Sequence, residues 1–182
     1  MAMVGPDLYE AFLKGYTIKQ WGVDPKEIPA SVLKRLPMRF NYNDNYYDKK
    51  YQGIPLKGYT HLVEAILDHD LISVKLDTPY SEEIALGFKH VFYSGKIDEY
   101  FDYSSGELGY RTVYWEDQRL IGDFQGNPVI NYADLSVPYT RIVEHKHFAP
   151  YNDFDQTIVS FEYSKETTRE DEPFYPKRLK AD

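Results

Sequence analysis

The sequence has no cysteine, no long hydrophobic run and no glycine-rich phosphate-binding motif. Without cysteine, neither disulfides nor a thiolate zinc site can form. No apolar stretch approaches the length of a membrane span, and no basic region followed by an apolar stretch opens the chain, so we expect a cytoplasmic protein without a signal peptide. Neither Gly-x-Gly-x-x-Gly nor Gly-Lys-Ser/Thr occurs. Both common devices for cradling a dinucleotide or a triphosphate are therefore absent.

Positive charge is also scarce, since the formal net charge is −8. That balance argues against nucleic acid and against anionic membranes as partners, because Lys and Arg drive both kinds of binding. A small anionic ligand stays compatible, since a few placed Arg residues decide it locally. Aromatic residues, by contrast, are plentiful, with 18 Tyr and 10 Phe among 182 residues. Such a chain is long enough for one domain or two small subdomains with a core.

The hydrophobic period changes along the chain, which predicts an α+β fold. Helices are expected from Pro6, from a capping pattern at Asp24–Glu27, over 30–36 and over Gly58–Asp68, with a long Tyr-rich loop at 40–57. After residue 70 the period becomes two. Strands are expected at 72–76, 90–94, 110–120, 129–132, 139–148 and 157–163. Their close spacing predicts a twisted, mainly antiparallel sheet following the helical subdomain. We expect a helical part over 1–70, a sheet over 71–168 and a charged tail over 169–182.

Two clusters could bind a metal. The spacing places His145 and His147 on one face of a strand, with Glu144 on the other, but no third ligand is evident. Packed or hydrogen-bonded histidines explain the pair better. Asp68 and Asp70 form the Asp-x-Asp pattern of metal-dependent sugar transferases, although solvated charges at a helix end explain them more simply. We therefore expect no metal and keep the transferase as an alternative.

Two arginines point to an anionic ligand. Arg141 shares a predicted strand face with His145 and His147, where a guanidinium can bind a phosphate in bidentate fashion. Arg35 lies on a short predicted helix before the Tyr-rich loop. Aromatic residues near helical spacing upstream could stack on a base or a sugar, although such residues are usually core. From the residues alone, a nucleotide-sugar or phosphate site is the hypothesis, with surface ion pairs as the alternative for the arginines.

Several stretches, occurring in order, together resemble the UDP-galactopyranose mutase family. They are Lys14–Trp21, Leu36–Tyr47, Tyr51–Thr60, Phe92–Asp102, Phe124–Tyr132, Val137–Phe148 and Asp171–Pro176. The resemblance implies an enzyme in which reduced FAD acts as a nucleophile on UDP-galactopyranose, UDP leaves and returns, and the sugar recloses as the furanose. It also implies that the FAD-binding portion and a C-terminal part of the same protein are missing here. We therefore expect this fragment neither to hold FAD nor to turn over. A homodimer is compatible with the resemblance, and a non-enzymatic nucleotide-sugar or carbohydrate-binding module is the alternative function.

The resemblance also suggests roles for individual residues, within a helical substrate-binding part over 1–70 whose mobile loop carries Arg35. Arg35 and Arg141 resemble the essential arginines at the diphosphate, with Arg141 also close to the flavin. The residues that resemble substrate contacts are Tyr46 and Tyr175 at the diphosphate, Phe12, Tyr16 and Thr17 at uridine, Trp21 at galactose, and Asn131 on the substrate side. Leu13 departs from relatives that carry a second aromatic residue there, so the packing on uracil is expected to differ.

Overall fold

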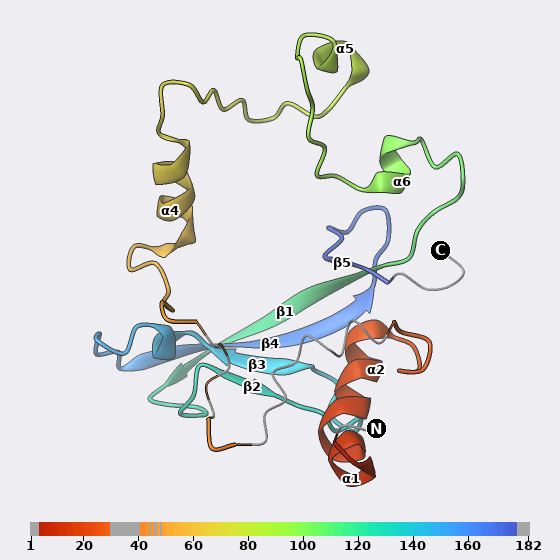
Figure 1. The fold of residues 1–182 in the computed structure, drawn as a ribbon. Helices are drawn as coiled ribbons and strands as arrows, with labels where there is room; N and C mark the ends of the chain where they lie inside the picture. The colour runs from red at the N-terminus through yellow and green to blue at the C-terminus, as the bar shows by residue number, and fades with distance from the viewer. Residues whose placement is uncertain (1–3, 30–40, 44, 46, 48, 178–182) are drawn as a thin grey trace. The chain divides into compact units, whose positions relative to one another are not determined.

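The computed structural model describes residues 4–29, 41–43, 45, 47 and 49–177. The chain divides into two compact units, one made of Met1–Leu36 with Tyr103–Asp182 and the other of Pro37–Asp102. Each is described by itself (Figure 1). The subdomain boundaries predicted at residues 70 and 168 stay a prediction.

The first unit opens with a continuous helical rod. It consists of α1 (Pro6–Leu8), the π-helical η1 (Tyr9–Lys14) and α2 (Gly15–Trp21). Pro6 suits the first turn, because its fixed φ matches the helix and its missing N–H leaves no bond unmade. The rod ends at Gly22, whose φ of 69° is left-handed and whose N–H donates to Ile18 O at 2.7 Å. The helix predicted from Pro6 is confirmed.

The helix predicted at Asp24–Glu27 is wrong, because this segment forms a turn. The Asp24 side chain accepts a bond from Lys26 N at 2.9 Å, and Asp24 O accepts one from Glu27 N at 2.9 Å. Asp thus closes a local turn, which competes with helix capping for the same residue types. The helix predicted over 30–36 lies outside the described residues.

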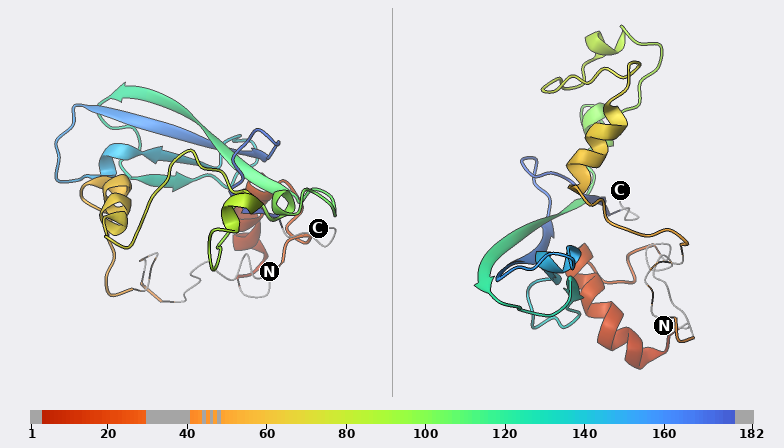
Figure 2. Two further views of the ribbon diagram at one scale, coloured as in Figure 1. Left: turned by 90° about the horizontal axis from the view of Figure 1, so that it is seen from above. Right: turned by 90° about the vertical axis from the view of Figure 1, so that its left-hand side faces the viewer.

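A five-stranded antiparallel sheet forms the body of this unit. Its strands are β1 (Tyr110–Ile121), β2 (Val129–Asn131), β3 (Arg141–Glu144), β4 (Gln156–Glu166) and β5 (Tyr175–Pro176). Their order is β2-β3-β4-β1-β5, and every pair is antiparallel. Figures 1 and 2 show β1 and β4 as two long neighbouring strands of a twisted, curled sheet. The α+β fold class is confirmed.

The strand predicted over 139–148 is only partly correct. β3 ends at Glu144, and His145–Phe148 form the 3-10 helix η2. One cause lies in the neighbouring strand, because β2 is preceded by Pro128, which has no N–H to extend the ladder. Glu144 N donates to Pro128 O at 2.9 Å, and the chain then leaves the sheet. His145 and His147 therefore do not share a strand face with Arg141.

The interior of the first unit is unusually polar. Among the described residues, the buried hydrophobic side chains are Trp21, Ile28, Ile142 and Val159. Buried polar side chains outnumber them and include Thr140, Glu144, Thr157, Ser160 and Glu162. Burying such groups is costly unless they are hydrogen-bonded. The bonds of these residues therefore matter to both the fold and the site.

The second unit contains α4 (Gly58–Leu67), α5 (Glu82–Ala85) and α6 (Ile97–Tyr100). The helix predicted over Gly58–Asp68 is confirmed. The strands predicted at 72–76 and 90–94 are wrong, since neither segment pairs with another strand. Period-two alternation stabilises a strand only beside a partner, and Val74 and Leu76 are 53% and 82% exposed. Across the part of the chain that the structure describes, we find no helix with the length and apolarity needed to span a bilayer.

Candidate functional site

Arg141 on β3 is held at both ends of its guanidinium group. Nη2 donates to the hydroxyl of Tyr16 on α2 at 2.5 Å. Nε lies 3.0 Å from Oε1 of Glu162 on β4, an ion pair that lacks hydrogen-bond geometry. The sheet register makes this contact, because Arg141 lies directly opposite Glu162. The side chain remains 32% exposed, so a ligand can reach it.

Charge and burial act together on this cluster. Burial lowers the pKa of Arg141, but Tyr16 and Glu162 outweigh it, so the net shift is upward. Burial raises the pKa of Tyr16 more than Arg141 lowers it. Arg141 is therefore a fixed cation and Tyr16 a neutral hydroxyl at physiological pH. Tyr175 contributes to both pKa shifts, which places it in the same electrostatic environment.

The buried carboxylate of Glu162 is itself held in place. Its Oε1 accepts a bond from the Thr140 hydroxyl at 2.8 Å, and Thr140 Oγ1 also donates to Glu162 O at 3.0 Å. The sequence did not single out Glu162 or Thr140. From sequence alone, an acidic residue in an alternating strand is expected to face solvent. Only the register between β3 and β4 shows that Glu162 lies opposite Arg141.

The remaining predicted residues fall into distinct environments. Trp21 is buried, and its ring centroid lies 6.1 Å from that of Tyr175 on β5. The buried Thr17 donates its hydroxyl to Leu13 O at 2.6 Å. Asn131 lies opposite Arg141 in the β2–β3 register and is exposed, while Phe12 is 65% exposed. Arg35 and Tyr46 lie outside the described residues.

The structure thus brings Tyr16, Asn131 and Arg141 together, and pairs Trp21 with Tyr175. A cation beside a neutral hydroxyl, reachable from solvent, can bind an anionic oxygen and donate hydrogen bonds to it. A sequence model of the UDP-galactopyranose mutase family matches residues 11–182. The chain belongs to this family. The family is FAD-dependent, and its members are mutases.

Individual relatives in this family cover nearly the whole chain. A probable UDP-galactopyranose mutase of Klebsiella pneumoniae is 50% identical, over 98% of this chain and 46% of that protein. A dTDP-fucopyranose mutase of Escherichia coli is 47% identical, over 98% and 49% respectively. A UDP-galactopyranose mutase of Mycoplasma pneumoniae is 34% identical, over 88% and 44%. The chain spans about half the length of these relatives. Their names do not favour the alternative of a non-enzymatic binding module.

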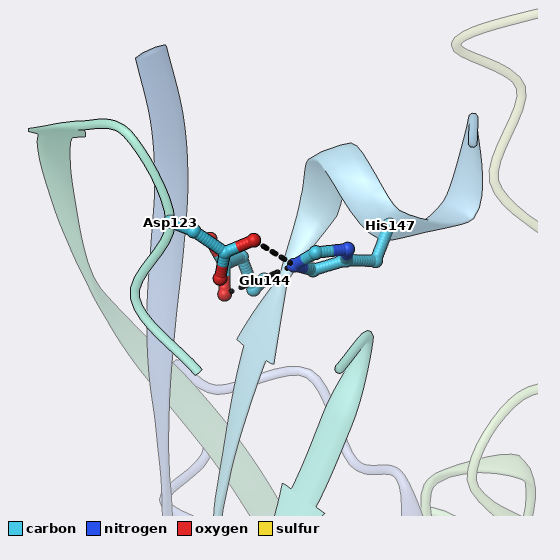
Figure 3. Close-up of side chains that lie close together, drawn as sticks. All are labelled: Asp123, Glu144 and His147. Atoms are coloured by element: carbon cyan, nitrogen blue, oxygen red, sulfur yellow. Dashed lines mark ion pairs between the residues drawn. The ribbon is translucent and has the colours of Figure 1, made fainter. Parts of the chain in front are cut away.

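A separate polar cluster lies at the end of β3 (Figure 3). Asp123, Glu144 and His147 offer ligand atoms within 4.8 Å of one another, and His147 Nε2 lies 3.3 Å from a carboxylate oxygen of each acid. Asp123 is the member of this group that the sequence did not reveal, and His145 does not belong to the group. Its side chain already accepts a bond from Gly126 N at 2.7 Å and lies 3.4 Å from the Lys146 ammonium.

Glu144 is the fully buried member of this cluster, and its oxygens are already bonded. They accept bonds from Phe124 N at 3.0 Å, Gln125 N at 2.7 Å and the Thr157 hydroxyl at 2.8 Å. Burial raises the pKa of Glu144, but these bonds outweigh it and the net shift is downward. A cation would compete with backbone amides and with Lys146. We therefore interpret the cluster as an anchor for the turn at 122–128.

The Asp-x-Asp pattern at the end of α4 gains no support as a metal site. Asp68 N donates to Glu64 O, and the ring of His69 accepts a bond from Leu71 N at 3.1 Å. Within the described ranges, Asp68 and Asp70 belong to no group of three side chains able to hold an ion. The alternative of a metal-dependent sugar transferase therefore has nothing to support it here.

Proposed function

We propose that this chain carries the nucleotide-sugar site of an FAD-dependent mutase that interconverts UDP-galactopyranose and UDP-galactofuranose. The observation that carries the proposal is the Arg141 guanidinium, held between Tyr16 and Glu162 and still open to solvent. Membership of the mutase family supports a specific ligand for this guanidinium, the diphosphate of the nucleotide sugar.

The chemistry explains why a fixed cation is needed. In the reaction that family membership implies, the bond between the anomeric carbon and the diphosphate breaks and later re-forms, and the diphosphate bears extra negative charge in between. Arg141 would stabilise that charge, with the hydroxyls of Tyr16 and Tyr175 as donors. Reduced FAD supplies the nucleophile at the anomeric carbon when it is bound.

This chain offers few of the features that usually bind a flavin dinucleotide. The sequence has no glycine-rich dinucleotide turn, and the described strands pair only in antiparallel fashion. Dinucleotide folds rely instead on parallel strand–helix–strand units. We therefore place the FAD-binding portion elsewhere in the same protein, with Arg141 as this chain's contact to the cofactor. A cytoplasmic location and a homodimer remain parts of the proposal.

The other residues would contact the substrate along its length. The exposed ring of Phe12 and the half-buried ring of Tyr16 suit a uracil face, with Thr17 beside them. Trp21 would line the galactose end, with Asn131 on the substrate side and Tyr175 at the diphosphate. Arg35 and Tyr46 would complete the diphosphate contacts.

A chimeric enzyme tests this proposal. This chain would replace the 178 residues to which it aligns in the Klebsiella pneumoniae relative. Purified chimera should show flavin absorbance and, after reduction, convert UDP-galactopyranose to the furanose form, detected by chromatography. A control chimera would carry Arg119→Ala, at an exposed arginine of β1, and should keep the activity. A folded, flavin-loaded chimera that binds UDP but makes no product would overturn the proposal.

A second substrate follows from the Escherichia coli relative. That protein is named a dTDP-fucopyranose mutase and is nearly as similar to this chain as the Klebsiella pneumoniae protein. Both reactions contract a sugar ring on a nucleoside diphosphate, so Arg141 would serve either. The same chimera assayed with dTDP-fucopyranose distinguishes them: we expect the higher kcat/KM with UDP-galactopyranose, and the opposite preference would assign the fucose substrate.

A further inference from the structure

Arg111 is a buried arginine to which neither the sequence patterns nor the proposed reaction gives a role. It lies near the start of β1 and is only 4% exposed. Its Nε donates to Gln20 O at 3.0 Å, and Nη2 donates to Lys19 O at 3.1 Å and to the Ser164 hydroxyl at 3.2 Å. Nη1 pairs with Glu166 at 2.9 Å. Its donors thus reach both α2 and β4.

The two carbonyls that Arg111 binds belong to the last turn of α2. Carbonyls there have no helical N–H partner, and the helix dipole makes this end negative. A planar guanidinium satisfies several such acceptors at once, which an ammonium group cannot do. Gly22 allows the close approach, because a Cβ at this position would lie 2.8 Å from Arg111 Nη1. Arg111 therefore fixes where α2 ends on the sheet.

The backbone of Arg111 holds a second element. Its carbonyl accepts a bond from Phe174 N at 3.0 Å, and Arg111 lies opposite Tyr175 in the β1–β5 register. Glu166 adds to this link, because it also pairs with Lys177 at 2.7 Å. One residue thus holds β5 by its main chain and α2 by its side chain.

We propose that Arg111 is a positioning residue for the nucleotide-sugar site, setting α2 and β5 so that Tyr16 meets Arg141 and Tyr175 lies beside them. The inference rests on the proposed function and extends it. Tyr16 lies about one helical turn before the Lys19 and Gln20 carbonyls that Arg111 binds, so a shift of the helix end moves its hydroxyl. Arg111 touches no ligand in this arrangement and acts through Tyr16.

The test is the affinity of the full 182-residue chain for UDP, measured by calorimetry. Arg111→Lys keeps the charge but cannot serve four acceptors, so we expect UDP binding about tenfold weaker at an unchanged folded fraction. Ser164→Ala removes one hydroxyl that binds both Gln20 O and Arg111, and should weaken binding by about two- to threefold while leaving the guanidinium in place. Arg119→Lys on the same strand is the matched control and should bind as the wild type does.

A double-mutant cycle separates positioning from mere stability. If Arg111 acts by placing Tyr16, Arg111→Lys combined with Tyr16→Phe should bind UDP no more weakly than the weaker single variant. Losses that multiply, or an unchanged Kd in folded Arg111→Lys and Ser164→Ala, would overturn the inference. The proposed function fails in a different way, by a wild-type chain that does not bind UDP or by Arg141→Ala binding as tightly as the wild type.

Discussion

At the scale of single residues, the proposed site depends on one cation and its two partners, Arg141 with Tyr16 and Glu162. The sequence could indicate Arg141, because an arginine on an alternating strand is a reasonable phosphate ligand and the family resemblance supports it. It could not indicate that Glu162 faces Arg141, since this contact depends on the register between β3 and β4. Trp21 was correctly placed on a helix, but its ring is buried against Tyr175.

Replacing Arg141 with alanine removes the proposed charge stabilisation. In the chimeric enzyme, Arg141→Ala should lower kcat/KM by about 100- to 1,000-fold, the usual cost of losing a donor that stabilises developing charge. Steady-state kinetics with UDP-galactopyranose measure the effect. A near-normal rate would show that Arg141 is only an ion-pair partner of Glu162.

Neutralising Glu162 tests how Arg141 is held. Glu162→Gln keeps an acceptor for the Thr140 hydroxyl but removes the charge that faces Arg141 Nε. Kinetics of the chimera should show a decrease of about tenfold in kcat/KM, since a misdirected guanidinium loses about one charged hydrogen bond. Glu116→Gln, at an exposed acid of β1, is the control. Equal kinetics for the two variants would exclude Glu162 from positioning Arg141.

At the scale of elements, pairing decided which patterns became strands. The alternation at 110–120 and 157–163 formed β1 and β4, which pair with each other along eleven positions. Similar alternation at 72–76 and 90–94 pairs with nothing. The sequence pattern is alike in these segments, so what it could not supply was the presence of a partner strand. The sequence also did not predict that β3 is followed directly by a 3-10 helix. His147 of this helix contacts Asp123 and Glu144 and helps to anchor the turn at 122–128.

The anchor formed by Glu144 predicts a pH dependence of stability. The folded pKa lies below the ordinary value of 4.5, so the folded state binds a proton less readily than the unfolded chain. The stabilisation is therefore fully present above pH 4.5 and is lost progressively as the pH falls from there through the lower pKa of the folded state. Denaturant unfolding of Glu144→Gln should show a loss of about 1–3 kcal/mol at pH 7 and a weaker pH dependence below pH 4.5.

The matched control for this experiment is Glu116→Gln, which should keep the acid dependence of the wild type. If the unfolding free energies of Glu144→Gln and the wild type differ by the same amount at every pH, the carboxylate is not ionised and bonded as described. Binding of zinc or manganese with a matching gain in stability would instead assign a metal to Asp123, Glu144 and His147.

At the scale of the whole molecule, the first unit holds every described residue of the proposed site. α2, β2 and β4 each place a residue beside Arg141 of β3, although they are far apart in sequence. The α+β class and the family were accessible from the sequence, because periodicity and ordered motifs are local properties. The convergence of Tyr16 and Glu162 on one guanidinium is a property of the assembled sheet and helix.

The most direct test of this convergence is the phosphorus NMR spectrum of UDP titrated with the 182-residue chain. The two diphosphate resonances should broaden and shift with wild-type protein and with Arg119→Ala. With Arg141→Ala they should change little at the same protein concentration, because the cation that contacts the diphosphate is gone. Identical shifts with wild type and Arg141→Ala, both folded, would contradict the placement of the nucleotide at Arg141.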